Sequence, residues 1–194
     1  MWPWGHLAVG YLAYATYTRY RHDEHPAGGP AVALAVATQL PDLIDKPLAY
    51  EVGVIPEGRS LAHSLPVAVP LCLLALGFAR RTSGWPGRVA VAVPLGYATH
   101  LFGDSVWELL ALDLDALSFL VWPVLAAPDY ATTSFEGHVE QFNESAGALS
   151  AGTLTPFAVE WVLFALAVGL WAWHRLPPLP TVVAALRSPD DTAP

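Results

Sequence analysis

The sequence feature that most limits the fold is a long, almost uncharged stretch near the C-terminal end, residues 155–173. Its only charged residue is Glu160. At ~1.5 Å per residue, a helix over this stretch is about 28 Å long, close to the ~30 Å hydrocarbon core of a bilayer. We therefore expect residues 155–173 to form a transmembrane helix.

Further apolar stretches lie at residues 61–79, 89–102 and 119–127, and they make the composition unusual. Of the 194 residues, 54% are hydrophobic and only 13% are charged, which is more apolar than ordinary soluble domains. The length allows one domain. We predict an all-α, multi-pass helical membrane protein with about four to five membrane-associated helices. A single helical domain would span residues 1–175, and residues 176–194 would form a mobile, polar, proline-rich tail.

The charged residues are unevenly distributed, and their signs predict an orientation in the cell membrane. The formal net charge is −8. Arginines gather in three places, at Arg19 and Arg21, at Arg80, Arg81 and Arg88, and at Arg175. The positive-inside rule makes these places cytoplasmic and puts the acidic stretch between Arg88 and Arg175 outside, with an outer loop expected around His138 and Glu140. Because no basic patch is present to neutralise phosphates, nucleic-acid binding is disfavoured.

The apolar stretches can then be laid across the membrane. The predicted passes, alternating in direction and beginning inward, are residues 5–20, 31–40, 61–79, 89–110 and 155–173. The first two of these are not convincing spans by length. Residues 41–59 hold several prolines and glycines and are expected to form an outer loop. Residues 119–127 are too short to cross at ~20 residues per span, so we expect an interfacial or re-entrant segment there.

Three smaller features set the chemical context. We expect no cleavable signal peptide, because the N-terminal residues lack a basic region followed by a small-residue cleavage site. Cys72 is the only cysteine, so a metal would have to be held by histidine and carboxylate. The acidic, lysine-poor composition is typical of a halophile, with an ordinary acidic outer face as the alternative.

Six histidines and aspartates come to the outer ends of their helices, or to the adjacent loops, in this topology. They are His6, Asp42, Asp45, His63, His100 and Asp104. His100 and Asp104 are four residues apart, so on a helix they share a face, as two metal ligands require. Ionisable groups near the hydrocarbon are costly unless paired or metal-bound. The alternatives are solvated acids at a helix end, core or interfacial histidines, and a structural His100–Asp104 hydrogen bond.

Four motifs in this chain resemble those of a known family. They are Gly5-His6, Leu40-Pro41-Asp42-Leu43-Ile44-Asp45, Arg59-Ser60-Leu61-Ala62-His63-Ser64 and Gly96-Tyr97-Ala98-Thr99-His100-Leu101-Phe102-Gly103-Asp104. The YdjM-like family of membrane-bound, metal-dependent hydrolases has Gly-His, Leu-Pro-Asp-x-Asp, Thr-His-Ser and Gly-Tyr-x-x-His-x-x-x-Asp in the same order. Residues 120–123 also resemble its Leu-Trp-Pro segment, and the likeness runs more loosely through the last helix.

The second motif departs from the family by one extra residue between its acids, and Ala62 replaces the usual threonine of the third. Whether Asp42, Asp45 or both take the family role therefore stays open. The family in turn resembles zinc-dependent phospholipase C. This resemblance implies that His6, Asp42 or Asp45, His63, His100 and Asp104 bind a divalent metal, in particular one to three Zn²⁺ ions. Glu160, and more weakly His138 and Glu140, are further candidates.

The resemblance also implies a reaction. Divalent ions held by carboxylate and imidazole activate water and polarise a phosphoryl oxygen. Whichever of Asp42 and Asp45 is not a metal ligand could act as the general base. At a membrane face the available phosphoesters are lipids, so we expect a hydrolase of a lipid or lipid-linked substrate, with its site on the extracytoplasmic face. The rival interpretation is a non-enzymatic metal-binding membrane protein, such as a transporter or assembly factor. A purely structural protein is the third, and the oligomeric state is left open.

Overall fold

The computed structural model describes residues 1–130, 134–177 and 179, and over these ranges the chain is helical with no β-strand. The all-α prediction is therefore confirmed for the described residues. In chain order the elements are α1 (Pro3–His22), α2 (Gly28–Ala37), α3 (Leu40–Pro47), the π-helix η1 (Leu48–Val52), α4 (Leu65–Ala79), α5 (Gly84–Ala111), the 3₁₀ helix η2 (Ser118–Val121), α6 (Phe135–Ser150) and α7 (Pro156–Trp173).

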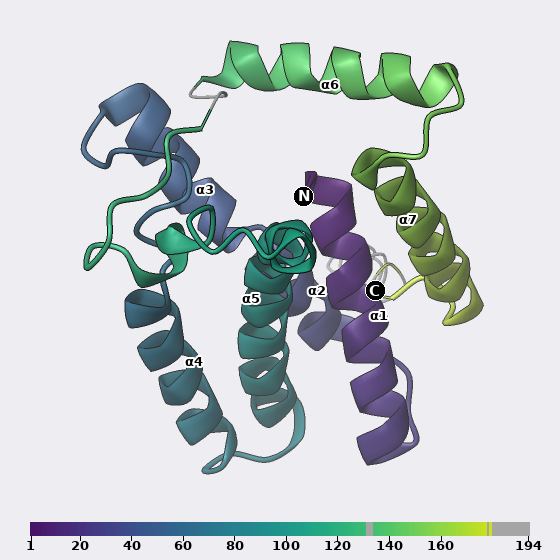
Figure 1. Cartoon of the computed structure of the whole chain (residues 1–194). Helices are drawn as coiled ribbons and strands as arrows, with labels where there is room; N and C mark the ends of the chain where they lie inside the picture. Colours follow the sequence, from purple (N-terminus) through teal and green to yellow (C-terminus); the bar gives the residue numbers. More distant parts are fainter. Residues whose placement is uncertain (131–133, 178, 180–194) are drawn as a thin grey trace, which may run out of the picture.

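Helix α5 is the centre of the bundle. It packs against α1, α2 and α4, and α7 packs against the other side of α1. Figure 1 shows α1, α4, α5 and α7 side by side, with α6 lying across one end. We call this end, which holds the starts of α1, α4 and α7, the upper end. The lower end holds the end of α1 and the turn between α4 and α5.

Only one helix among the described residues, α7, is both long and apolar enough to cross a membrane. Helix α4 is also apolar, but it has 15 residues. Both helices turn apolar side chains outward, among them Leu74, which is 72% exposed, and Val162, which is 60% exposed. The expected four to five membrane-associated helices therefore stay a prediction.

The expected outer loop at residues 41–59 is wrong in its first part, because α3 and η1 occupy residues 40–52. Pro41 lies in the first turn of α3. Proline is well tolerated there because the first N–H groups of a helix have no intrahelical partner. As a result Asp42 and Asp45 lie three residues apart on a helix and share a face.

The expected outer loop in the acidic stretch after residue 133 is also wrong, because α6 forms there. Ser134 caps this helix, and its Oγ accepts a hydrogen bond from the backbone N–H of Gly137 at 3.1 Å. Phe142 of α6 contacts Trp2 and Phe157 edge-to-face. Burying this aromatic side chain against α1 and α7 favours the helix over an open loop.

One other boundary differs from expectation. Helix α4 begins at Leu65 instead of residue 61, because residues 60–64 form the loop that carries His63. In the segment 119–127 the only helix is η2, with Phe119 fully buried. The predicted tail, apart from residues 176, 177 and 179, lies outside the described residues.

The upper end of α1 is held by a carboxylate from α7. The backbone N–H of Trp2 donates to Glu160 Oε2 at 2.8 Å, and α1 has no side-chain cap of its own. Gly5 makes this approach possible, because a Cβ there would lie 2.5 Å from Glu160 Oε2. This contact fixes the first turn of α1, on which His6 lies.

Candidate metal centre

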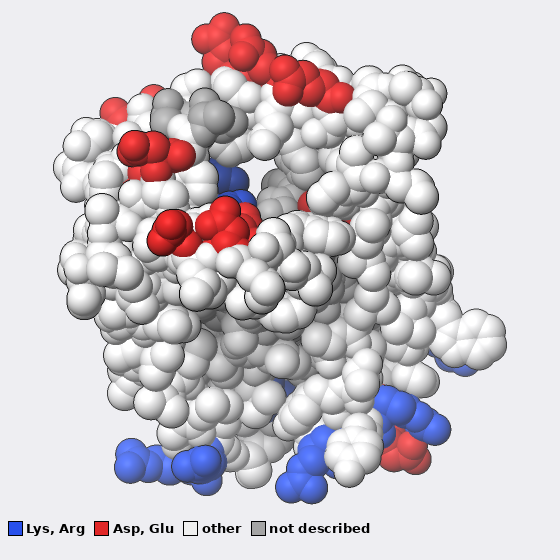
Figure 2. Space-filling model, in the orientation of Figure 1, with Lys and Arg blue, Asp and Glu red and all other residues white. Residues whose placement is uncertain are grey.

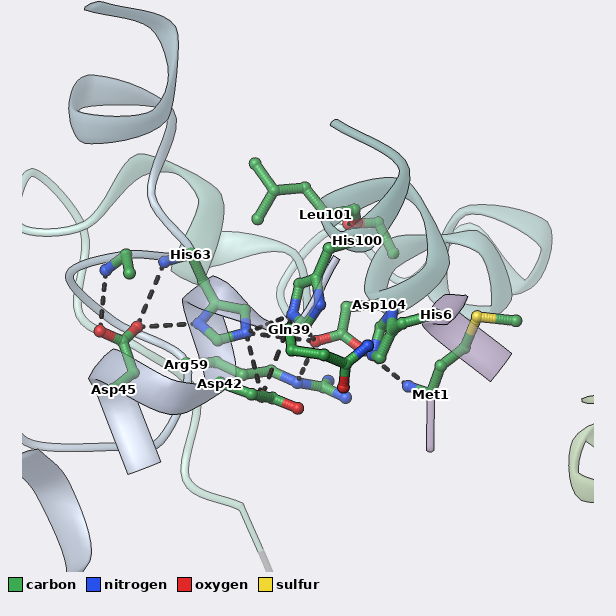
Figure 3. Close-up of polar contacts among 12 residues, drawn as sticks. Met1, His6, Gln39, Asp42, Asp45, Arg59, His63, His100, Leu101 and Asp104 are labelled. Carbon is green, nitrogen blue, oxygen red and sulfur yellow. Dashed lines mark hydrogen bonds and ion pairs between the residues drawn. The ribbon is translucent and has the colours of Figure 1, made fainter. Parts of the chain in front are cut away.

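Four of the predicted ligands meet near the upper end of the bundle (Figure 3). Asp42, His63, His100 and Asp104 each offer one ligand atom, and these atoms all lie within 4.8 Å of one another. Asp42 comes from α3, His63 from the loop before α4, and the other two from α5. His63 and His100 are fully buried and Asp104 is 3% exposed.

His100 is oriented by a backbone carbonyl. Its Nδ1 lies 2.7 Å from the carbonyl oxygen of Thr38, at the end of α2. That oxygen can only accept, so Nδ1 carries the hydrogen and donates it. The close approach depends on Gly96, where a Cβ would lie 2.8 Å from the carbonyl oxygen of Leu34. Nε2 of His100 is thereby left as the free ring nitrogen, directed into the cluster.

His63 is oriented in the same way by a carboxylate. Its Nδ1 donates to Asp45 Oδ2 at 2.8 Å. Asp45 also accepts from the backbone N–H groups of Ser60 at 2.9 Å, Ala62 at 2.8 Å and His63 at 3.2 Å. The Tyr97 hydroxyl donates to the carbonyl of Ala62 and ties the same loop to α5. Asp45 therefore shapes the loop and the ring of His63 without joining the group of four.

These hydrogen bonds leave two lone pairs facing each other. Nε2 of His63 and Nε2 of His100 are 3.0 Å apart, and neither neutral ring carries a hydrogen there. Asp104 Oδ2 lies 3.4 Å from the first and 3.6 Å from the second. Asp42 Oδ1 lies 3.5 Å and 3.9 Å from the same two nitrogens. A buried cluster composed only of acceptors requires a cation, either a proton or a metal ion.

The pKa values indicate that, with no metal bound, a proton serves as this cation. Burial on its own lowers the pKa of His63, but its hydrogen bonds with Asp104, Asp42 and Asp45 outweigh burial and raise the pKa to about 10. Burial raises the pKa of Asp42, but its hydrogen bond with His63 and the nearby charge of Lys46 hold that pKa well below its usual range. Lys46 Nζ lies 2.7 Å from Asp42 Oδ2.

His6 lies beside the group of four. Its ring stacks on that of His100 with centroids 3.8 Å apart, and its Nε2 is 3.3 Å from Asp104 Oδ1. The ring is fully buried, yet neither nitrogen has a hydrogen bond of good geometry among the described residues. A buried imidazole in this state fits a ligand position, because a metal ion would satisfy the lone pair of one nitrogen.

Positive groups surround Asp104 on its other sides. Arg59 Nε lies 3.1 Å from Asp104 Oδ2, and the N-terminal amine of Met1 lies 2.6 Å from Oδ1. The Arg59 guanidinium also lies over the rings of Phe119, at 5.8 Å, and Tyr130, at 5.3 Å. Its side chain is 25% exposed, so Arg59 is a charged group at the edge of the buried cluster.

The structure thus brings the six histidines and aspartates together, but they do not all join the same group. The group of four contains one residue of the Leu-Pro-Asp motif, Asp42, while Asp45 supports His63 from behind. Glu160 accepts from Trp2, and His138 Nδ1 donates to the carbonyl of Ser134 at 2.8 Å. Neither belongs to the group, and neither does Glu140.

Two contributors were not predicted from the sequence. The Thr38 carbonyl carries no residue-type signal, so nothing in the sequence identifies it as the partner of His100. Arg59 begins the motif that contains His63, but a single arginine in an expected loop is normally interpreted as a solvated charge. Its place four residues before a candidate ligand histidine was the only available signal.

In a comparison with protein families, residues 1–176 match the family model described as YdjM inner membrane protein. No curated protein and no solved structure matches the chain.

Proposed function

This chain belongs to the YdjM inner membrane protein family, and we propose that it is a metal-dependent hydrolase of a phosphoester in a lipid or lipid-linked substrate. The observation that carries the proposal is the pair of facing Nε2 atoms of His63 and His100, 3.0 Å apart beside two carboxylates. Such a set of acceptors matches a divalent cation.

The types of ligand atom in the cluster favour zinc. Imidazole nitrogen and carboxylate oxygen are ligands that Zn²⁺ accepts in catalytic sites. Each ring also has the outer hydrogen bond that ligand histidines usually make, from His63 to Asp45 and from His100 to the Thr38 carbonyl. His6 extends the set toward a second ion. When bound, zinc would supply an activated water and an electrophile for a phosphoryl oxygen.

The chain's own residues would have distinct roles around the reacting phosphoester. Arg59 is the cation at the edge of the cluster, and a guanidinium binds phosphate oxygens through several parallel hydrogen bonds. Asp42 is the group's least buried carboxylate, 9% exposed, and its second oxygen is held by Lys46. We assign Asp42 to proton transfer or ligation and Asp45 to positioning of His63.

A membrane setting supports a lipid substrate. We propose that α1, α4, α5 and α7 cross the membrane, with the upper end outside. The outward apolar side chains of α4 and α7 need lipid to cover them, because exposed apolar patches of this size are unfavourable in water. The cluster then lies at the level where phosphoester headgroups meet the protein.

The proposal is tested first by metal content. Zinc or another divalent ion should co-purify with the full chain, and His100→Ala and Asp104→Ala should each lose it. His22→Ala is the matched control, because His22 is an exposed histidine at the lower end. If no divalent ion co-purifies, or if His100→Ala retains as much as the parent chain, the metal centre is refuted.

Activity is the second test. Phosphodiesterase activity on a phospholipid substrate should be lost in His63→Ala and Asp104→Ala and retained in His22→Ala. Arg59→Lys should raise KM more than it lowers kcat, since it keeps the charge and loses the planar fork. Metal retention without any phosphoesterase activity would favour the non-enzymatic reading, a metal carrier or assembly factor.

A further inference from the structure

A second site lies at the opposite end of the molecule from the metal centre. A cavity of about 590 Å³ opens at the lower end between α1 and α4, with the start of α5 as its back wall. Its lining includes Tyr14, Arg21, Arg80 and Arg88. No described aspartate or glutamate lines it, so the cavity is basic.

The arginines differ in how far they are neutralised. Arg88 is paired with Glu24, with one guanidinium nitrogen 3.1 Å from Glu24 Oε1. Arg21 and Arg80 have no ion pair with any described residue. Figure 2 shows basic side chains gathered at the lower end and acidic ones at the upper end. Two unpaired guanidiniums at the mouth of one cavity are suited to an anion.

A polar group inside the cavity supports a ligand. Tyr14 is 2% exposed and lines the cavity, yet its hydroxyl makes no hydrogen bond with any described residue. That oxygen is not among the buried atoms without a partner, so it is open to the cavity and can still take a hydrogen-bond partner. A ligand oxygen in the cavity would provide one.

An apolar groove runs along the outside of α4 toward the same end. It has a volume of about 530 Å³ and is lined by Pro70, Leu73, Leu74, Gly77, Phe78 and Arg81. Leu73, Leu74 and Phe78 are 62%, 72% and 55% exposed. Gly77 leaves a notch in this face, since nothing lies within 4 Å of a Cβ placed there. The groove is shaped for an acyl chain, and Arg81 closes its lower end.

We propose that the lower end binds one anionic phospholipid, with the headgroup phosphate in the cavity at Arg21 and Arg80 and an acyl chain in the groove of α4. Arg80 and Arg81 follow each other in the chain, so one lipid can reach both hollows. Guanidiniums bind phosphate oxygens in parallel pairs, and basic pockets between helices are where anionic headgroups are bound. This site is independent of the proposed hydrolase activity, because it lies at the other end of the helices.

The test uses the full chain purified in detergent and native mass spectrometry with an equal mixture of phosphatidylglycerol and phosphatidylcholine. We expect one retained phosphatidylglycerol, preferred by about tenfold over phosphatidylcholine. The variant Arg21→Gln/Arg80→Gln should lose the preference. Arg19→Gln is the matched control, because Arg19 is paired with Asp23 and does not line the cavity.

A second variant separates the contribution of the cavity to lipid binding from that of the surface charge. Tyr14→Phe leaves the net charge unchanged and removes only the hydroxyl, so it should weaken phosphatidylglycerol retention, whereas Tyr20→Phe, at an exposed tyrosine outside the cavity lining, should not. Thermal unfolding and the elution volume in size-exclusion chromatography, both in detergent, report whether each variant is folded. Three outcomes overturn the proposal: equal retention of both lipids, equal loss in Arg19→Gln and the double variant, or retention of added inorganic phosphate with no retention of phosphatidylglycerol, which would make this a free-phosphate site.

Discussion

At the scale of single residues, Asp42 and Asp45 are three positions apart on α3 and have different partners. Asp42 faces His63, His100 and Lys46, whereas Asp45 accepts only from the loop that ends at His63. The sequence left open which acid takes the family role. The hydrogen bonds separate them, because a carboxylate occupied by four donors has little capacity left for an ion.

This difference predicts that an aspartate-to-asparagine substitution acts mainly on stability at Asp45 and mainly on metal binding at Asp42. In Asp45→Asn an amide N–H₂ would face backbone N–H groups, leaving buried donors unsatisfied, so the free energy of unfolding of the metal-free protein should fall by about 3 kcal/mol. Asp42→Asn should lower that free energy less, through the lost interactions with protonated His63 and Lys46, and should weaken metal binding at least tenfold. Thermal unfolding and metal titration in detergent measure both. Equal destabilisation by the two variants would contradict the separate roles.

The raised pKa of His63 predicts how pH acts on the metal-free protein. Its value of about 10 exceeds the ordinary 6.5, so the imidazolium stabilises the fold fully below pH 6.5 and this contribution is lost as pH rises toward 10. Stability should decline between pH 7 and 9 by at most ~1.4 kcal/mol per unit. His63→Gln has no such proton and should give a flat profile over the same range.

Metal binding should show the reverse trend with pH. An ion that binds Nε2 of His63 must displace the proton held there, so apparent affinity should rise by up to about tenfold per unit between pH 7 and 9. Proton release on metal addition, measured in a weakly buffered solution with an indicator dye, checks this. Binding without any proton release would mean that the ion does not use His63.

At the scale of helices, the contact between α2 and α5 sets the position of His100. Gly96 lets the two backbones approach closely, and the Thr38 carbonyl at the end of α2 then reaches the ring. The glycine of the Gly-Tyr-x-x-His motif thereby has a packing role and the tyrosine a tethering role. Both act on the geometry of the ligands without touching an ion.

Gly96→Ala should therefore weaken metal binding from a distance. The added methyl would push α2 away from α5, at a cost of about 1–3 kcal/mol in stability, and withdraw the Thr38 carbonyl from His100. Unfolding and metal titration measure the two effects. Gly147→Ala on α6 is the control, since nothing lies within 4 Å of its Cβ, and it should be neutral or stabilising by up to ~1 kcal/mol. Unchanged metal affinity in Gly96→Ala would show that the carbonyl is dispensable.

The sequence predicted some helices better than others for physical reasons. Helix α7 follows from a stretch of membrane length with a single charged residue, and the His100–Asp104 pair follows from the helical repeat. Helix α6 was missed because its acids and glycines read as a loop, although Ser134 at the cap and Phe135 and Phe142 seven residues apart favour a helix. Helix α3 was missed because the prolines and glycines of residues 41–59 were taken to indicate a loop, whereas Pro41 lies in the first turn of a helix.

At the scale of the whole molecule, the sequence predicts that the site residues gather at one end of the bundle. It does not predict the contacts that orient their side chains. Charge asymmetry and alternating apolar stretches were enough to place His6, His63 and His100 together. The partners of their ring nitrogens depend on close packing of backbones, which no residue pattern encodes. The number of membrane crossings also stays a prediction.

The two ends of the bundle should lie on opposite sides of the membrane. The turn between α4 and α5, residues 80–83, belongs to the basic lower end, and Gly152 follows α6 at the acidic upper end. Reporter fusions at these positions should report a cytoplasmic and an extracytoplasmic location, respectively, by the positive-inside rule. A fusion at each place that reports the same side would overturn this arrangement.

The acidic upper end has a further consequence for how an ion arrives. Glu136, Glu140 and Glu144 lie on α6 across that end, and Asp113 and Asp115 follow α5. Such a surface holds a counterion atmosphere, and a local potential of about −30 mV concentrates a divalent cation roughly tenfold over bulk solution. Sodium chloride screens this surface potential and so reduces the local concentration of the divalent cation. Loading of the centre should therefore slow as ionic strength rises, while an ion already bound in the buried cluster stays in place.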